Sequence, residues 1–116
     1  DVIPADLLLH AYRQGVFPMG MDDGTIGWFS PDPRGVMPLD AGFHVPSRLA
    51  RVLRSGRFTT TVDRDFEGVM RACAADREDG TWISDEIVES YVALHRLGRA
   101  HSVEVWRDAR LVGGLY

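Results

Sequence analysis

Apolar and polar residues alternate along residues 101–116, the last sixteen of the chain. Val103 and Val105 alternate with polar neighbours, and a polar turn at residues 108–109 separates them from a second alternating run. This period of two predicts a β-hairpin with one apolar face. A hairpin is only marginally stable alone, and Gly113-Gly114 indicates a bulge or a close backbone approach. We therefore expect the sheet to continue beyond these residues, in a chain that is a fragment of a larger cytoplasmic protein.

Helical spacing of the apolar residues predicts four helices in the rest of the chain. They run from Pro4 to Gln14, from Ser47 to the residue before Gly56, from Asp63 or Asp65 to Ala75, and from Ser84 to the residue before Gly98. Ser47 and Ser84 are expected to be N-caps. Short strands are expected near residues 25–29, 35–39 and 57–62. Because helices and strands mix without strict alternation, an α+β fold is predicted.

Composition narrows the functional classes. A net charge of −4 over 116 residues excludes a uniformly basic nucleic-acid binder, but it leaves room for a local basic patch. The single cysteine, Cys73, excludes an intramolecular disulfide and a cysteine-based zinc site. The four histidines are scattered without metal-ligand spacing, so no metal is expected. No apolar run has transmembrane length and no signal peptide begins the chain, so no membrane contact is expected.

A row of arginines, Arg48, Arg51 and Arg54, follows the second predicted helix at a spacing of three. This spacing places the three side chains on one side of the helix. No acidic residue lies between Asp40 and Asp63 to neutralise them. Arginine binds phosphate through its planar guanidinium group, so the row is typical of a phosphate-binding surface. A solvated helix face is the alternative that the spacing alone leaves open.

Large aromatic residues lie at several predicted junctions between loops and regular elements. Trp28-Phe29 precedes a proline-rich turn, and Trp82 lies between a charged loop and a helix cap. Such side chains can stack on a nucleic-acid base. Aromatic residues are more often part of the core, and spacing alone favours the core here.

Several segments together resemble the leucyl/phenylalanyl-tRNA–protein transferase family. They are Ala11-Tyr-Arg-Gln-Gly-Val-Phe-Pro18, Trp28-Phe-Ser-Pro-Asp-Pro-Arg34, Gly80-Thr-Trp-Ile83, His101-Ser-Val-Glu-Val-Trp106 and Leu111-Val-Gly-Gly-Leu-Tyr116. The resemblance implies a bacterial cytoplasmic enzyme that moves Leu or Phe from aminoacyl-tRNA to the N-terminal amine of a protein. Acceptor proteins of this family begin with Arg or Lys, and the product is marked for degradation through the N-degron route.

The same resemblance implies a fold and a set of site residues. The family joins a small N-terminal domain, here residues 1–62, to a domain like the GCN5-related acetyltransferases, here the truncated start at residues 63–116. Its basic patch for the tRNA phosphates matches Arg48, Arg51 and Arg54, and its contact with the terminal adenosine matches Trp82. Met19 stands where some relatives place a stacking Trp, a role that Phe17 or Trp28 could take. Arg34, Glu104 and Tyr116 are weaker candidates near the cleft, and the catalytic residues are expected downstream of Tyr116.

The chemistry implied by the resemblance needs no cofactor. The ester of an aminoacyl-tRNA is already activated, so the enzyme has to hold the ester and the amine together, remove a proton and stabilise the oxyanion. The expected partners are aminoacyl-tRNA and acceptor proteins, with the enzyme acting as a monomer. Two alternatives remain from the residues alone. One is a non-catalytic RNA-binding module, and the other is an acetyl-CoA-dependent N-acetyltransferase suggested by the Gly113-Gly114 hairpin.

Overall fold

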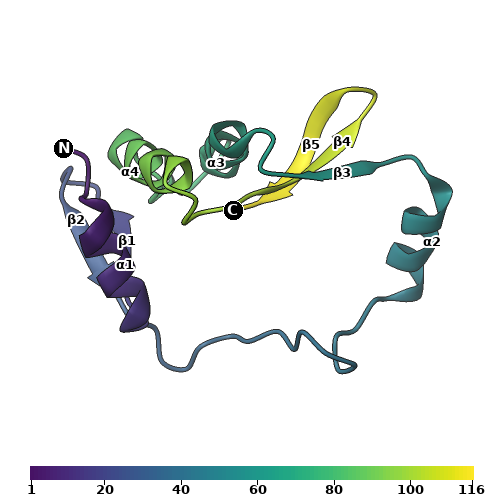
Figure 1. Cartoon of the computed structure of the whole chain (residues 1–116), viewed down its shortest axis with the longest axis horizontal. Coiled ribbons are helices and arrows are strands. Elements are labelled where there is room, and N and C mark those ends of the chain that lie inside the picture. Colours follow the sequence, from purple (N-terminus) through teal and green to yellow (C-terminus); the bar gives the residue numbers. More distant parts are fainter.

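The computed structural model describes residues 1–116 and has the α+β fold that the sequence predicts, with four helices and two small antiparallel sheets. The elements follow in the order α1 (Ala5–Arg13), β1 (Phe17–Gly20), β2 (Ile26–Phe29), α2 (Ser47–Ser55), β3 (Thr59–Val62), α3 (Phe66–Ala74), α4 (Asp85–Arg96), β4 (Val103–Arg107) and β5 (Arg110–Leu115). Figure 1 shows the chain as an open ring, with α1 and α4 on one side, α2 on the other, and the long loop after β2 closing it.

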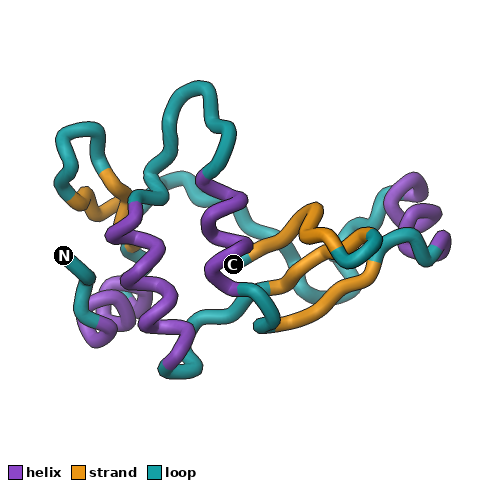
Figure 2. The backbone as a smooth tube through the Cα atoms, turned by 90° about the horizontal axis from the view of Figure 1, so that it is seen from above, coloured by secondary structure: helices purple, strands orange, loops and turns teal.

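The hydrophobic core is built around α4 and lies where α1 and α3 pack against it (Figure 2). Four apolar residues of α4 recur at helical spacing and are buried: Ile87, Val88, Tyr91 and Leu94. The spacing puts them on one stripe, which is the side that an amphipathic helix buries. Leu8 of α1 and the residues Phe66 and Met70 of α3 complete the centre of the same cluster.

The larger sheet has the strand order β3-β4-β5, with all neighbours antiparallel. Its middle strand, β4, pairs with β3 across the boundary between the two segments expected from the family resemblance, 1–62 and 63–116. Helix α3 packs against β5, where Gly114 lies so close to Val69 that a Cβ on this glycine would be 2.9 Å from the valine side chain. A close backbone approach is therefore found at Gly114.

The predicted hairpin of residues 101–116 is confirmed, but its buried face is not the apolar one. Asp108 and Ala109 form its turn with φ values of 52° and 64°, and the register shifts between Val105 and Trp106. Such a pair of positive φ values matches the twist of a two-residue hairpin. Glu104 is completely buried, whereas Val103 is 40% exposed and Leu115 is 69% exposed. The apolar face that the sequence predicts is therefore not the face that packs into the fold.

Hydrogen bonds explain why a carboxylate replaces the valines inside the fold. Glu104 accepts hydrogen bonds from the Thr61 hydroxyl at 2.6 Å, from the Arg64 backbone N–H at 3.1 Å and from the Ser102 hydroxyl. The Trp106 indole donates in turn to the Thr61 hydroxyl at 2.7 Å. Burial alone would raise the pKa of Glu104, but these donors outweigh it, and the pKa lies below its ordinary value. The charged carboxylate thus joins β3, β4 and the start of α3.

Two predictions for the remaining elements are wrong, the strand at residues 35–39 and Ser47 as a helix cap, and the structure decides between the two candidate caps of α3. Residues 35–39 form no strand; the partner of β2 is the unpredicted strand β1, which a five-residue connection brings alongside it. Ser47 is the first residue of α2 and not its cap, because Pro46 occupies the cap position and makes no side-chain bond. Of the two candidate caps of α3, Asp65 is the one whose side chain accepts from Gly68 N. Ser84 caps α4 as predicted. No helix of the structure combines the length and apolarity needed to cross a membrane.

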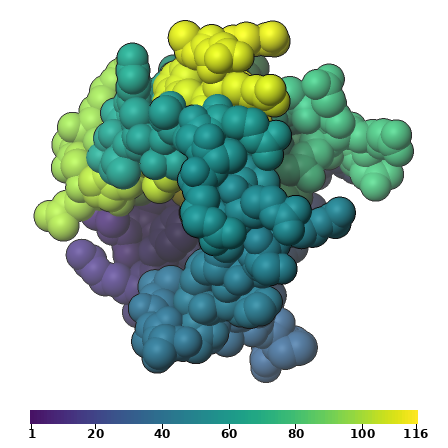
Figure 3. Space-filling view, turned by 90° about the vertical axis from the view of Figure 1, so that its right-hand side faces the viewer, coloured from purple at the N-terminus to yellow at the C-terminus, as the bar shows by residue number.

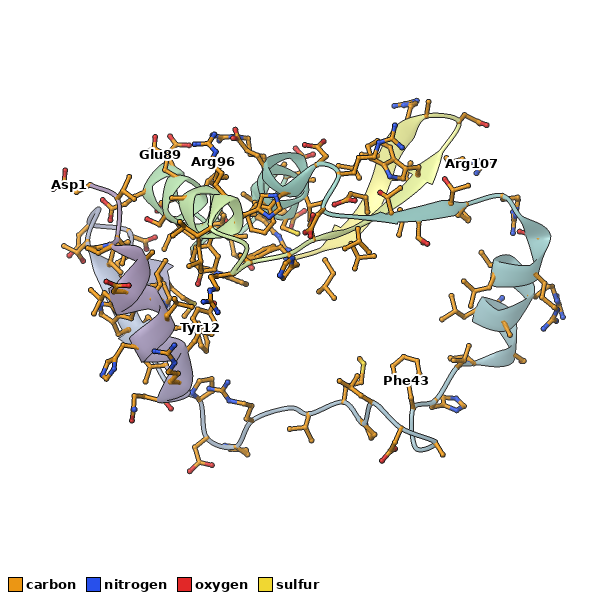
Figure 4. The ribbon with its side chains drawn as sticks, in the orientation of Figure 1. Asp1, Tyr12, Phe43, Glu89, Arg96 and Arg107 are labelled. Carbon is orange, nitrogen blue, oxygen red and sulfur yellow. The ribbon has the colours of Figure 1, made fainter.

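Replacing the buried carboxylate tests its structural role. We expect Glu104→Gln to lower the free energy of unfolding of the full-length protein by about 1–3 kcal/mol, because an amide leaves buried donors without a charged acceptor. Urea denaturation followed by circular dichroism measures the change. Glu89→Gln is the matched control, because Glu89 lies on the exposed side of α4 (Figure 4), and it is expected to change stability by less than about 0.5 kcal/mol.

The pH dependence of the same difference gives a second readout. The pKa of Glu104 is lowered in the folded state, so its contribution is complete above the ordinary glutamate value of about 4.3 and is lost as the pH falls through the folded value. The stability difference between Glu104→Gln and the unmodified protein should therefore shrink between neutral pH and pH 3. A difference that stays constant over this range would contradict the assigned role.

Candidate functional site

Helix α2 carries the predicted arginine row and stands apart from the core. Pro46 precedes the helix and Gly56 ends it in the left-handed conformation, with φ 71°. No residue of α2 is buried, and the side chains of Arg48, Arg51 and Arg54 are exposed. None of the three forms a salt bridge. The helix therefore presents three unpaired positive charges to the surroundings on one side.

The opposite side of α2 faces the hairpin across an apolar cleft. The cleft has a volume of about 360 Å³ and is lined by residues of α2, of the segment after it and of β4 and β5: Leu49, Val52, Leu53, Phe58, Val105 and Val112. Because both walls are apolar, the cleft fixes which side of α2 turns inward, and the arginines occupy the other side.

Trp82 lies just before α4, beside the small sheet. Its backbone carbonyl accepts from Gly20 N at 2.8 Å, so the end of β1 is bonded directly to this residue. A Cβ at Gly20 would lie 3.0 Å from that carbonyl oxygen and from the Ser84 side chain, which explains the glycine. The Trp82 side chain itself is 47% exposed. The backbone is thus held while the indole remains accessible, as a stacking platform requires.

The two other candidates for the adenosine site lie on the β1–β2 hairpin. Pro18 pairs with Trp28, and Met19 pairs with Gly27. Directly opposite residues of a strand pair share a face and consecutive residues alternate, so Met19 and Trp28 belong to opposite faces of the hairpin. Trp28 is 40% exposed and Met19 is partly buried. The two side chains therefore cannot enclose one base between them.

A second hollow, of about 330 Å³, lies between α1, α4 and the end of β5, and aromatic residues dominate its lining. The hydroxyls of Tyr12 and Tyr91 are hydrogen-bonded at 2.5 Å, and the ring of Tyr91 meets that of Tyr116 edge-on at 5.9 Å. Burial raises the pKa of both Tyr91 and Tyr116, and the Trp82 side chain acts in the opposite direction on Tyr116. The hydroxyls thus stay neutral and able to donate a hydrogen bond.

An ionisable pair lies at the rim of this hollow. His101 lines the hollow, and its Nδ1 lies 2.8 Å from the Asp63 carboxylate, which also accepts from Ser102 N at 3.0 Å. The bond with His101 is the main reason why the pKa of Asp63 is lowered, and the bond with Ser102 adds to it. Asp63 adopts a positive φ of 58°. Because Asp63 is charged, the proton of a neutral His101 sits on Nδ1, which leaves Nε2 as the acceptor.

The three weaker candidates occupy different surroundings. Arg34 donates to the carbonyl of Gly15 at 2.8 Å and lies 5.8 Å from the centre of the Phe17 ring, so it ties the start of the long loop to β1. Glu104 is inside the fold, with its oxygens bonded to protein donors. Tyr116 is part of the aromatic hollow.

The predicted site residues fall into two groups on opposite sides of the molecule. Trp82, Tyr116 and the β1–β2 hairpin lie near α4, whereas the arginines of α2 lie across the ring (Figures 1 and 4). Sequence reasoning did not single out Tyr12, Tyr91 or Asp63 as site residues. The tyrosines have the helical spacing of ordinary core residues, and the only signal is that the buried phenol of Tyr91 needs a polar partner. No group of three or more potential metal ligands occurs among residues 1–116.

Comparisons with known proteins agree with the sequence segments that carry the family resemblance. The family model described as leucyl/phenylalanyl-tRNA protein transferase matches residues 36–116, and the model for the N-terminal domain of the same transferase matches residues 2–32. The leucyl/phenylalanyl-tRNA–protein transferase of Rhodopseudomonas palustris (strain HaA2) is 52% identical over 98% of this chain and 52% of the relative.

Two further relatives give the same result. The transferase of the same name from Gluconobacter oxydans is 53% identical over 100% of this chain and 53% of its own length, and that from Pseudomonas fluorescens is 50% identical over 98% and 51%. The chain therefore spans about half of the length of the curated relatives that it matches. The two family models together cover nearly all of it, and the chain belongs to the leucyl/phenylalanyl-tRNA protein transferase family.

Proposed function

We propose that this chain is the tRNA-binding half of an enzyme that moves Leu or Phe from aminoacyl-tRNA to the N-terminal amine of acceptor proteins. The observation that carries the proposal is the row of Arg48, Arg51 and Arg54 on a helix without buried residues and without a single ion pair to these arginines. Guanidinium groups without acidic partners are free to bind the phosphates of an RNA backbone.

The separation of the two groups of candidate residues fits one RNA that reaches both. The arginine row on α2 would hold phosphates of the acceptor stem, and Trp82, on the far side of the ring, would stack on the terminal adenosine. The single-stranded 3′ end of a tRNA joins the acceptor stem to the terminal adenosine, so one tRNA would contact both groups of residues. In this arrangement the terminal nucleotide lies next to the aromatic hollow, where the aminoacyl ester would begin its transfer.

Transfer itself needs two reactants in position more than it needs a reactive side chain. The aminoacyl ester is activated, so the acceptor amine can attack once its proton is removed and the developing oxyanion is stabilised. The residues of this chain contribute binding and orientation. We propose that the acceptors begin with Arg or Lys, that transfer marks them for degradation, that no cofactor takes part, and that the groups acting on the reacting atoms lie in the part of the relatives that this chain does not cover.

The sheet β3-β4-β5 is proposed to be the opening of a domain like the GCN5-related acetyltransferases. The alternative of an acetyl-CoA-dependent reaction was suggested by the two glycines of the terminal hairpin, Gly113 and Gly114. The contact between Gly114 and Val69 accounts for one of these glycines without a ligand. We therefore retain the aminoacyl-transferase proposal alone.

The decisive experiment is transfer of labelled leucine by the full-length protein from Leu-tRNA to a peptide that begins with Arg. We expect labelled peptide to form without ATP or added metal, and the same peptide with an acetylated N-terminus to remain unlabelled, because it lacks the attacking amine. Absence of transfer, with acetyl-CoA consumed in a parallel reaction, would contradict the proposal. Binding of tRNA without any transfer would point to a non-catalytic RNA-binding module.

Removing one arginine of the row tests its phosphate contact. We expect Arg51→Ala to weaken tRNA binding by the full-length protein about tenfold at low salt and to reduce the slope of log K against log salt by about 1. Fluorescence anisotropy across a salt titration measures both values. Arg51→Lys keeps the charge and is expected to retain the slope. An unchanged slope in Arg51→Ala would assign these arginines to an ordinary solvated helix face.

The role of Trp82 is tested by shortening and by replacing the indole. We expect Trp82→Ala to raise the KM for aminoacyl-tRNA about 5–150-fold, because stacking of one base on an aromatic side chain is worth about 1–3 kcal/mol. Trp82→Phe retains a stacking surface and should restore most of the loss. Because the indole is half-exposed and the fold depends here on the backbone carbonyl, melting temperatures should change little. An equal KM in the three proteins would contradict adenosine stacking.

A further inference from the structure

We infer that the RNA-binding surface continues from α2 onto the tip of the terminal hairpin, where Arg107 and Arg110 form a second phosphate-binding patch. The inference rests on the proposed function, because it assumes an RNA partner. The two arginines are paired directly across β4 and β5 at the end of the hairpin, and both are exposed. Figure 3 shows the face concerned, with the hairpin in yellow above the teal residues of α2 and the segment that follows it.

The apolar cleft makes the two basic regions neighbours. Its walls come from α2 and from the hairpin, and Val112 belongs both to this cleft and to the neighbouring surface hollow lined by Arg107, Asp108 and Arg110. Arg57 follows α2 directly and precedes Phe58, which also lines the cleft. Arg57 and the hairpin pair thus lie beside the cleft, and the arginine row lies on the outer side of the helix that forms one of its walls, so that all six arginines belong to the side of the molecule that carries α2 and the hairpin.

This side is positive although the chain as a whole is negative. It carries six of the thirteen cationic residues of the chain, and within the hairpin tip the single acid is Asp108. None of these six arginines forms a salt bridge, whereas Arg71 on α3 is paired with both Glu67 and Asp85. This local excess of positive over negative charge raises the potential of the surface, which attracts a polyanion.

Interactions within the fold hold two of the side chains in place before any ligand binds. The Arg107 guanidinium lies 5.8 Å from the centre of the Phe58 ring, and Arg57 Nε donates to the Ser55 hydroxyl at 3.2 Å. The Ser55 hydroxyl itself donates to the Val52 carbonyl at 2.6 Å in the last turn of α2. Because these side chains are already restrained, they lose less conformational entropy when they bind a phosphate. The two-residue turn at Asp108-Ala109 restrains the backbone of the hairpin tip.

The partner that fits this surface is the sugar–phosphate backbone of a double-stranded RNA segment. Evenly spaced negative charges match a row of separate arginines from two elements, and base edges are not needed for such binding. An acidic protein segment would also be attracted by the charge. It lacks the regular spacing of phosphates and the planar bidentate fit of each phosphate to a guanidinium.

The inference is tested with the full-length protein carrying Arg107→Gln and Arg110→Gln together, using a fluorescent RNA duplex without an aminoacyl group as the probe. We expect the slope of log K against log salt to fall by about 2, because each phosphate that an arginine neutralises adds about 0.9 to the slope. Arg96→Gln is the matched control, because Arg96 lies on α4 far from Arg107 (Figure 4), and it should leave the slope unchanged.

Further arms separate the possible outcomes. Arg110→Gln alone removes an exposed side chain that forms no salt bridge, and it should lower the slope by about 1 even if the double variant is unstable. An unchanged slope in this variant, with a reduced slope in Arg51→Ala, would overturn the inference and leave the proposed function intact. Absence of RNA binding in the unmodified protein would contradict the proposed function itself. Displacement of the duplex by a polyglutamate peptide of equal charge would assign the surface to an acidic protein and overturn the inference.

Discussion

The buried carboxylate of Glu104 is the interaction on which the rest of the fold depends. It lies on the middle strand of the larger sheet and receives donors from Thr61 of the edge strand β3, from Arg64 in the segment between β3 and α3, and from Ser102 just before β4. A charge removed from water is tolerable only when hydrogen bonds within the protein replace those made to the solvent. The requirement for these donors fixes the register of β3 against β4, and that register determines where α2, which precedes β3, is held.

The geometry of the candidate site depends on this scaffold and on one further backbone hydrogen bond. The core around α4 supports the aromatic hollow, and the bond from Gly20 N to the Trp82 carbonyl places the small sheet beside it. The arginine row depends on neither, because α2 is joined to the fold through β3 and the apolar cleft. The proposed sites for the RNA stem and for its terminal nucleotide therefore lie on two separate parts of the structure.

Local chemistry made much of this fold predictable. Helical periods located all four helices, the side-chain oxygens of Asp65 and Ser84 marked two helix starts, and Asp108-Ala109 marked the hairpin turn. The exposed position of the arginines followed from their spacing. The buried face of the hairpin could not be predicted, because the bond between Thr61 and Glu104 joins residues 43 positions apart. The Tyr12–Tyr91 pair, 79 positions apart, is hidden from sequence reasoning for the same reason.

The long loop between β2 and α2 has a consequence for how such proteins diversify. Residues 30–46 are exposed throughout and contribute no strand or helix, while Arg34 anchors their start to the carbonyl of Gly15. The two family models meet inside this loop, one ending at residue 32 and the other beginning at residue 36. Lengthening an exposed loop costs little free energy, because closure entropy grows only slowly with length. Insertions and deletions can accumulate here over evolution without disturbing the strand register on either side.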